Sequence, residues 1–110
     1  MKLSLGWHKD KWLDIENIFI SANDRGLKFG DGIFETILIK NNNAVLIDEH
    51  IQRLENSNRV LNMSLNINKS HLKDIVGQGI KKLSLKNHQL GSVRINYSRG
   101  LNKSLSLIHI

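Results

Sequence analysis

The 110-residue chain contains no cysteine and no proline, and only 5% of its residues are aromatic. The lack of cysteine excludes disulfide frameworks, thiolate metal sites and cysteine nucleophiles, and it favours a reducing compartment. No apolar run approaches the roughly 20 residues that a membrane-spanning helix requires, and the apolar stretch at the amino terminus is too short for a signal peptide. We therefore expect a cytoplasmic protein that does not enter the membrane.

Basic charge is what the chain has in excess: 16 Lys and Arg against 10 Asp and Glu, a net charge of +6 with histidines neutral. The lysines are scattered, and only Lys81 and Lys82 are adjacent. This distribution argues against nucleic-acid binding and for a solvated surface that attracts phosphate esters and carboxylates. The histidines show no metal-ligand spacing, so no metal site is predicted.

The first half of the chain has the apolar pattern of strands. Strands are expected at residues 3–5 and 15–20, with a turn over 8–11 between them, followed by an ordered, glycine-rich loop over 23–32. In the strand predicted for 33–40, both faces are partly apolar, which is typical of a central strand. An asparagine turn over 41–43 then leads into a short strand over 44–47.

The second half predicts two helices and a strand. Asp48 is expected to cap the first helix, whose apolar face would carry Ile47, Ile51, Leu54 and Leu61. The second helix is expected to run from Ser70 to Leu83, with Gly77 and Gly79 marking a close packing contact, and Val93, Ile95 and Tyr97 are expected to point inward from the strand over 92–98. This order predicts an α+β domain spanning 1–110, with an antiparallel sheet and both helices on one side.

Two arginines are candidates for anion binding. Arg53 lies at the flank of the predicted buried helix face, where its fork could hold a phosphate or carboxylate. The alternative is a surface arginine that pairs with Glu49 or Glu55. Arg99 ends a strand and could bind a carboxylate through two hydrogen bonds, or it could simply be a turn residue. Arg94 points away from the predicted core and is the poorer candidate.

Three segments together resemble one enzyme family. Residues 23–36 (NDRGLKFGDGIFET), 48–54 (DEHIQRL) and 93–100 (VRINYSRG) are similar, in order and spacing, to the class IV, fold-type-IV pyridoxal-phosphate enzymes. The resemblance implies the small amino-terminal domain of D-amino acid aminotransferase-like enzymes, and the motifs look most like aminodeoxychorismate lyase, which forms 4-aminobenzoate for folate synthesis. Branched-chain and D-amino acid aminotransferases are the alternatives within the family, although their usual residues at the positions of Thr36 and Phe34 differ.

The resemblance also implies roles for individual residues. Arg53 would hold the phosphate of pyridoxal 5'-phosphate, and Arg99 would help to bind the substrate carboxylate. Phe34 and Thr36 would face the cofactor cleft, and the complete enzyme would be a homodimer.

The family's Schiff-base lysine lies in a carboxy-terminal domain, and none of the eleven lysines in this chain matches its position. Residues 1–110 are therefore expected to be the amino-terminal part of a two-domain enzyme, without a catalytic residue and inactive alone. Two alternatives are a small basic module that binds anions or nucleic acid, and a fragment that pairs with a separately encoded second half.

Overall fold

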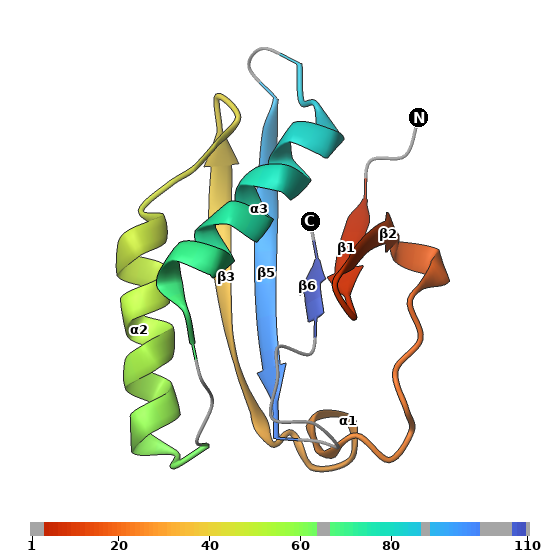
Figure 1. Cartoon of the computed structure of the whole chain (residues 1–110), viewed down its shortest axis with the longest axis vertical. Helices are drawn as coiled ribbons and strands as arrows, with labels where there is room; N and C mark the ends of the chain where they lie inside the picture. The colour runs from red at the N-terminus through yellow and green to blue at the C-terminus, as the bar shows by residue number, and fades with distance from the viewer. Residues whose placement is uncertain (1–3, 64–66, 87–88, 100–106, 110) are drawn as a thin grey trace.

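The computed structural model describes residues 4–63, 67–86, 89–99 and 107–109. Six antiparallel strands form one sheet in the order β2-β1-β6-β5-β3-β4, and two long helices cover one of its faces (Figure 1). The predicted α+β architecture is thereby confirmed. The elements are β1 (Leu5–His8), β2 (Lys11–Asp14), a 3-10 helix (Ile15–Asn17), α1 (Arg25–Phe29), β3 (Gly32–Lys40), β4 (Asn43–Ala44), α2 (Ile47–Val60), α3 (Lys69–Leu83), β5 (Leu90–Ser98) and β6 (Leu107–His109).

The long strands β3 and β5 pair over nine residues each and form the centre of the fold. Strict alternation along both strands divides their side chains between two faces of the sheet. One face packs under α2 and α3 and includes Ile37 and Ile95, which have no exposed surface. The other, which we call the open face, lies away from these helices and carries Phe34, Thr36, Leu38, Lys40, Arg94 and Asn96.

The prediction that the strand over 33–40 is central is wrong, although β3 carries apolar residues on both faces. β4 pairs with β3 only at Ile39 and Lys40, so most of one β3 edge has no neighbouring strand among the described residues. Phe34 and Leu38 are instead exposed on the open face.

Helix α2 begins differently from the prediction. Leu46, with φ of 56°, precedes its first residue, and no side chain caps the helix. Asp48 lies in the first turn, where it pairs with Lys73 at 3.0 Å and Lys69 at 3.5 Å and so links α2 to α3. Ile51 and Leu54 are buried as expected, but Leu61 is exposed because the helix ends at Val60.

Helix α3 agrees with its predicted span and buried face. The side chain of Asn68 accepts a hydrogen bond from the backbone N–H of His71 at 3.0 Å and caps the helix. Leu72, Ile75 and Val76 are among its buried residues. Of the two glycines, Gly79 is buried, but a Cβ at Gly77 would touch nothing within 4 Å, so a packing contact at Gly77 is excluded.

The amino-terminal hairpin is present, with shifted boundaries. Lys9 and Asp10 adopt positive φ between β1 and β2. The second strand was predicted at 15–20, but β2 ends at Asp14 and a 3-10 helix follows. Leu3 lies outside the described residues.

The asparagine turn is confirmed. Asn41 and Asn42 both have positive φ, as a two-residue hairpin turn requires. The strand after it is shorter than predicted and ends at Ala44, because the left-handed Leu46 turns the chain into α2.

Strand β6 was not predicted. It pairs with β1 on one side and with β5 on the other, and so joins the hairpin to the rest of the sheet. Ile108 at its centre is fully buried. Among the described residues, no helix has the length and apolar character needed to cross a membrane.

Candidate functional site

The glycine-rich segment before β3 contains a helical turn instead of only a loop. The carboxylate of Asp24 accepts a hydrogen bond from the N–H of Gly26 at 2.7 Å, which caps α1. The same oxygen accepts from the Ser98 hydroxyl at 2.6 Å and fastens α1 to the end of β5. Gly30 ends α1 with φ of 64°, and a Cβ at Gly32 would lie 2.6 Å from the Tyr97 carbonyl oxygen. Glycine is therefore needed at both positions.

This close approach leaves a cavity of about 470 Å³ between α1 and the adjoining ends of β3 and β5. Phe34, Arg94 and Asn96 line it from the open face, and Leu27 lines it from α1. No lysine is among the described residues that line it. The cavity thus combines an apolar wall with the guanidinium of Arg94 and the carboxylate of Asp24, whose Oδ1 already accepts from Gly26 and Ser98.

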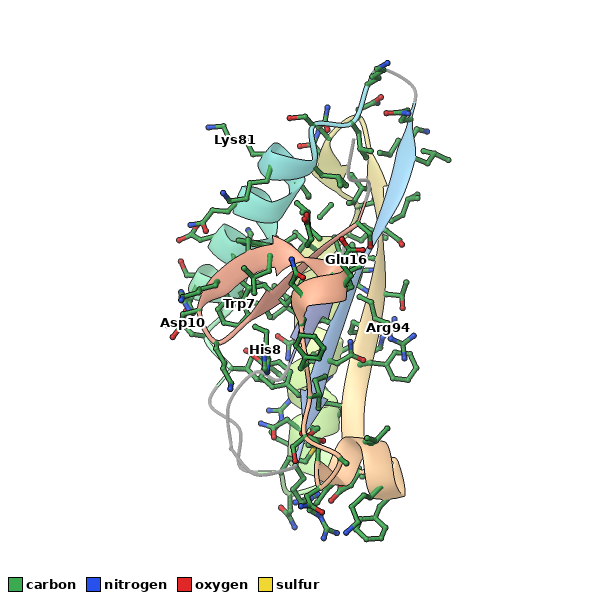
Figure 2. The ribbon with its side chains drawn as sticks, turned by 90° about the vertical axis from the view of Figure 1, so that its right-hand side faces the viewer. Trp7, His8, Asp10, Glu16, Lys81 and Arg94 are labelled. Carbon is green, nitrogen blue, oxygen red and sulfur yellow. The ribbon has the colours of Figure 1, made fainter. Side chains whose placement is uncertain are left out.

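Arg94 is the cationic group of this cavity. Its guanidinium carbon lies 4.0 Å from the centre of the Phe34 ring, and its Nε donates to the Asn96 side-chain oxygen at 3.2 Å. Phe34 itself is 56% exposed. In the side view, Arg94 projects from the sheet on the side opposite α3 (Figure 2). An arginine over an exposed ring can bind a carboxylate that is attached to a flat apolar group.

Arg53 lies on the other side of β3. Its Nε donates to both Glu35 oxygens at 3.1 and 3.0 Å, and its Nη2 donates to Glu35 Oε1 at 2.7 Å. The Nδ1 of His50, one turn earlier on α2, donates to the same oxygen at 2.7 Å. Arg53 is 66% exposed whereas Glu35 is only 7% exposed. The surface pairing of Arg53 with Glu49 or Glu55 is therefore wrong, because its partner is the buried Glu35.

The electrostatics of this cluster favour its charged form. Burial alone would raise the pKa of Glu35, but the hydrogen bonds from Arg53 and His50 outweigh burial and hold that pKa below its usual value. Hydrogen bonding to Glu35 also raises the pKa of Arg53. Glu35 is thus an anion at neutral pH, and Arg53 remains a cation with a large exposed surface.

Arg99 is engaged within the protein. Its Nε donates to the Asp31 carboxylate at 3.0 and 3.1 Å, and its terminal nitrogens donate to the carbonyl oxygens of Leu61 at 2.8 Å and Asn62 at 3.2 Å. Arg25 donates to the same carboxylate at 2.8 Å. Hydrogen bonds from Arg25 and then Arg99 lower the pKa of Asp31. Arg99 therefore connects the start of β3 to the end of α2, and its role toward a substrate carboxylate stays a prediction.

The structure brings some of the predicted residues together and separates others. Phe34 and Thr36 share the open face, and Thr36 is paired in register with Arg94. Thr36 is not among the residues lining the cavity. Arg53 is on the opposite face, so a ligand that touches both Arg53 and the open face must cross the edge of β3. Their roles toward a ligand stay predictions.

Sequence reasoning passed over Arg94, Glu35 and His50. Arg94 points away from the predicted core, and the pairing of β3 with β5 places it on the same face as Phe34. Glu35 is a carboxylate in an otherwise apolar row of β3, and such a buried charge requires a cationic partner. That signal could have been read from the sequence, whereas the partners Arg53 and His50 and the shared face of Arg94 and Phe34 required the structure.

The chain is similar to known proteins over most of its length. Residues 32–107 match the family model described as "Amino-transferase class IV". A Methanocaldococcus jannaschii protein, provisionally named a branched-chain-amino-acid aminotransferase, is 30% identical over 83% of this chain and 31% of its own length. The D-alanine aminotransferase of Staphylococcus aureus (strain N315) is 29% identical over 74% of this chain and 28% of its own length. The chain thus spans about a third of the length of these relatives.

Solved structures share the fold. A hypothetical aminotransferase from Mycobacterium tuberculosis in its PLP-bound form superposes with a TM-score of 0.84 at 24% identity, covering 96% of this chain and 38% of the other. The 4-amino-4-deoxychorismate lyase from Pseudomonas aeruginosa superposes with a TM-score of 0.62 at 24% identity, covering 84% and 34%. At 24% identity, these two similarities show that the fold is shared.

Proposed function

We propose that this chain, which belongs to the class IV aminotransferase family, provides one side of a pyridoxal 5'-phosphate site. This side would bind the phosphate of the cofactor and the carboxylate of the substrate. The family depends on this cofactor. When bound, pyridoxal phosphate supplies an electron sink for bonds to the α-carbon of an amino substrate. The described residues contribute binding and orientation.

Arg53 fits a phosphate monoester. A guanidinium has five N–H donors in one plane, and Glu35 occupies the side formed by Nε and Nη2. The Nη1 side is turned away from Glu35, and the side chain is 66% exposed. A phosphate can therefore bind Arg53 without displacing Glu35.

Arg94 and Phe34 carry the substrate proposal. A guanidinium stacked 4.0 Å from an exposed ring, in a cavity of about 470 Å³, suits a carboxylate on a flat ring better than one on a small aliphatic chain. We therefore infer an aminodeoxychorismate lyase activity for the complete enzyme. Thr36 is paired in register with Arg94 on the open face but lies outside the cavity lining, so its hydroxyl is proposed to face the cofactor cleft. The motifs around Phe34 and Thr36 support the same assignment.

An aminotransferase acting on small amino acids is the second candidate. The observation in its favour is that the relatives with 29–30% identity are named D-alanine and branched-chain aminotransferases. In that case Arg94 would bind the carboxylate of an amino or keto acid.

The complete enzyme would have a second domain and form a homodimer. Phe34, Leu38 and Leu90 are exposed large apolar side chains on β3 and β5, which suits a surface covered by further protein. In this proposal the second domain supplies the catalytic lysine.

Ligand titrations followed by the NMR spectrum of the backbone amides test this proposal. Pyridoxal 5'-phosphate should bind roughly ten- to a hundredfold more tightly than pyridoxal, and Arg53→Ala should remove that difference, because one charge-assisted phosphate contact contributes about 1.5–3 kcal/mol. Separately, 4-aminobenzoate should shift the backbone amide signals of Phe34, Arg94 and Asn96. Arg94→Gln should weaken the binding of 4-aminobenzoate.

The outcomes separate the candidates. If D-alanine or 2-oxo acids shift those signals and 4-aminobenzoate does not, the aminotransferase is correct and the lyase is not. If pyridoxal and its phosphate bind equally, Arg53 does not hold the phosphate.

A further inference from the structure

Among the described residues, Glu35 is the only acidic residue that is buried. It lies in β3 between Ile33 and Ile37, which are both buried core residues. Removing a carboxylate from water is costly unless cations and hydrogen bonds compensate for the loss of hydration. A charge at this position needs an explanation beyond packing.

Both partners of Glu35 come from one side of α2. His50 and Arg53 are three residues apart, so they lie on neighbouring positions of the helix surface. Together they give Glu35 four hydrogen bonds of 2.7–3.1 Å. Glu35 Oε1 receives His50 and Arg53 at once, and this holds the Arg53 side chain against β3.

The contact fixes the orientation of Arg53. A free arginine side chain is flexible, and ordering it costs conformational entropy. The side-on contact with Glu35 sets the plane of the guanidinium and directs its Nη1 side away from the buried carboxylate. The ordering cost is thereby met in the folded protein before an anion arrives.

We infer that Glu35 is a positioning residue for the phosphate-binding arginine, and that His50 holds Glu35 in place. This inference rests on the proposed function, in which Arg53 binds the cofactor phosphate. The opposing possibility is that Glu35 only neutralises Arg53. The two differ in sign: removing a neutralising carboxylate would tighten anion binding, whereas removing a positioning carboxylate weakens it although the net charge becomes more positive.

The test compares Glu35→Gln with Asp48→Asn in the full chain. Each substitution removes one negative charge, but Asp48 pairs with Lys69 and Lys73 and is not in contact with Arg53. Titrations with pyridoxal 5'-phosphate and with pyridoxal are followed by the 15N signal of Arg53 Nε, and the proton exchange rate of that N–H is measured without ligand.

We expect E35Q to raise the dissociation constant of pyridoxal 5'-phosphate about tenfold, in the range that supporting residues contribute at metal sites. Pyridoxal affinity should not change, and exchange of the Arg53 Nε–H should accelerate. D48N should change neither the dissociation constant of pyridoxal 5'-phosphate nor the exchange rate of the Arg53 Nε–H by more than about twofold. His50→Gln should give a smaller loss than E35Q.

Three results would overturn the inference. Unchanged or tighter binding of the phosphate by E35Q would show that Glu35 does not position Arg53, while the wild-type phosphate preference would leave the proposed function intact. An Arg53 signal that does not respond to pyridoxal phosphate in the wild type would refute both. If circular dichroism shows E35Q unfolded, Glu35→Asp replaces it, since it keeps the charge but shortens the reach; normal affinity in E35D would equally contradict the inference.

Discussion

Tyr97 shows at the scale of a single residue how burial changes the chemistry of a side chain. It is the only tyrosine in the chain, and it is buried in the core with 6% exposure. Burial raises the pKa of its hydroxyl to about 12, from an ordinary value of 10.0. The phenol is therefore held in its neutral form by the fold.

Absorbance at 295 nm should show one tyrosine titration near pH 12 in the folded chain and near pH 10 in denaturant. The folded state binds this proton more tightly than the unfolded state, so its contribution to stability is present below pH 10 and is lost as the pH rises toward 12. Tyr97→Phe should lack the signal. A folded-state midpoint at pH 10 would show that the ring is accessible to water.

Arg53, Arg94 and Arg99 show how differently three similar side chains are used. Arg53 is held by Glu35, Arg94 stacks on Phe34, and Arg99 donates to Asp31 and to the carbonyls of Leu61 and Asn62 just after α2. Arg99 has all three of its guanidinium nitrogens in contacts within the protein. Of the three, Arg53 and Arg94 therefore have the geometry to receive a ligand without breaking such a bridge.

At the scale of the element, two glycines test the difference between conformational and packing constraints. Gly77 lies within α3 with nothing near its missing side chain, whereas Gly32 opens β3 against the Tyr97 carbonyl. Gly77→Ala should raise the free energy of unfolding by about 0.5–1 kcal/mol, because alanine loses less backbone freedom in a helix.

Gly32→Ala is the matched substitution in a crowded place. Its Cβ would lie 2.6 Å from a backbone oxygen, so β3 and β5 would have to separate, and we expect a loss of about 1–3 kcal/mol. Urea unfolding of both variants measures the two effects. Equal effects of the two substitutions would contradict the close contact at Gly32.

At the scale of the whole molecule, three carboxylates connect different elements. Glu35 joins β3 to α2, Asp31 joins the start of β3 to α1 and β5, and Asp48 joins α2 to α3. All three carboxylates have lowered pKa values. Burial would raise the pKa of Glu35, but hydrogen bonds from Arg53 and His50 outweigh it. Hydrogen bonds from Arg25 and Arg99 lower the pKa of Asp31, and a hydrogen bond from Lys73 lowers that of Asp48.

These shifts predict sensitivity to acid. Because the folded carboxylates bind protons more weakly than the unfolded ones, their contribution to stability is present above pH 4.5, the ordinary value for Glu35, and is lost as the pH falls through the folded pKa values. Urea unfolding at pH 7, 5 and 3.5 should show a decline concentrated below pH 4.5, and the decline should be shallower in E35Q. A stability that stays constant down to pH 3.5 would refute the ionic links.

Much of the fold followed from local patterns. Alternation in β5 placed Val93 and Ile95 inside, helical spacing placed Ile51 and Leu54 inside, and the asparagines predicted a turn with positive φ. The errors fell where neighbours along the chain carry no information. β6 exists because β1 and β5 present edges to it, and α1 is stabilised by Asp24 and by its bond to Ser98.

The sequence by itself determined the fold class, the family and which residues share a face, because these depend on periodicity and on motif spacing. Only the tertiary structure decided which charges meet. Glu35 and Arg53 are separated by 18 positions and Arg99 and Leu61 by 38, so their pairing depends on how α2 packs on the sheet. Contacts between distant residues are set by packing, and that is why Arg99 became a link within the fold while Arg94 became the cation of the cavity.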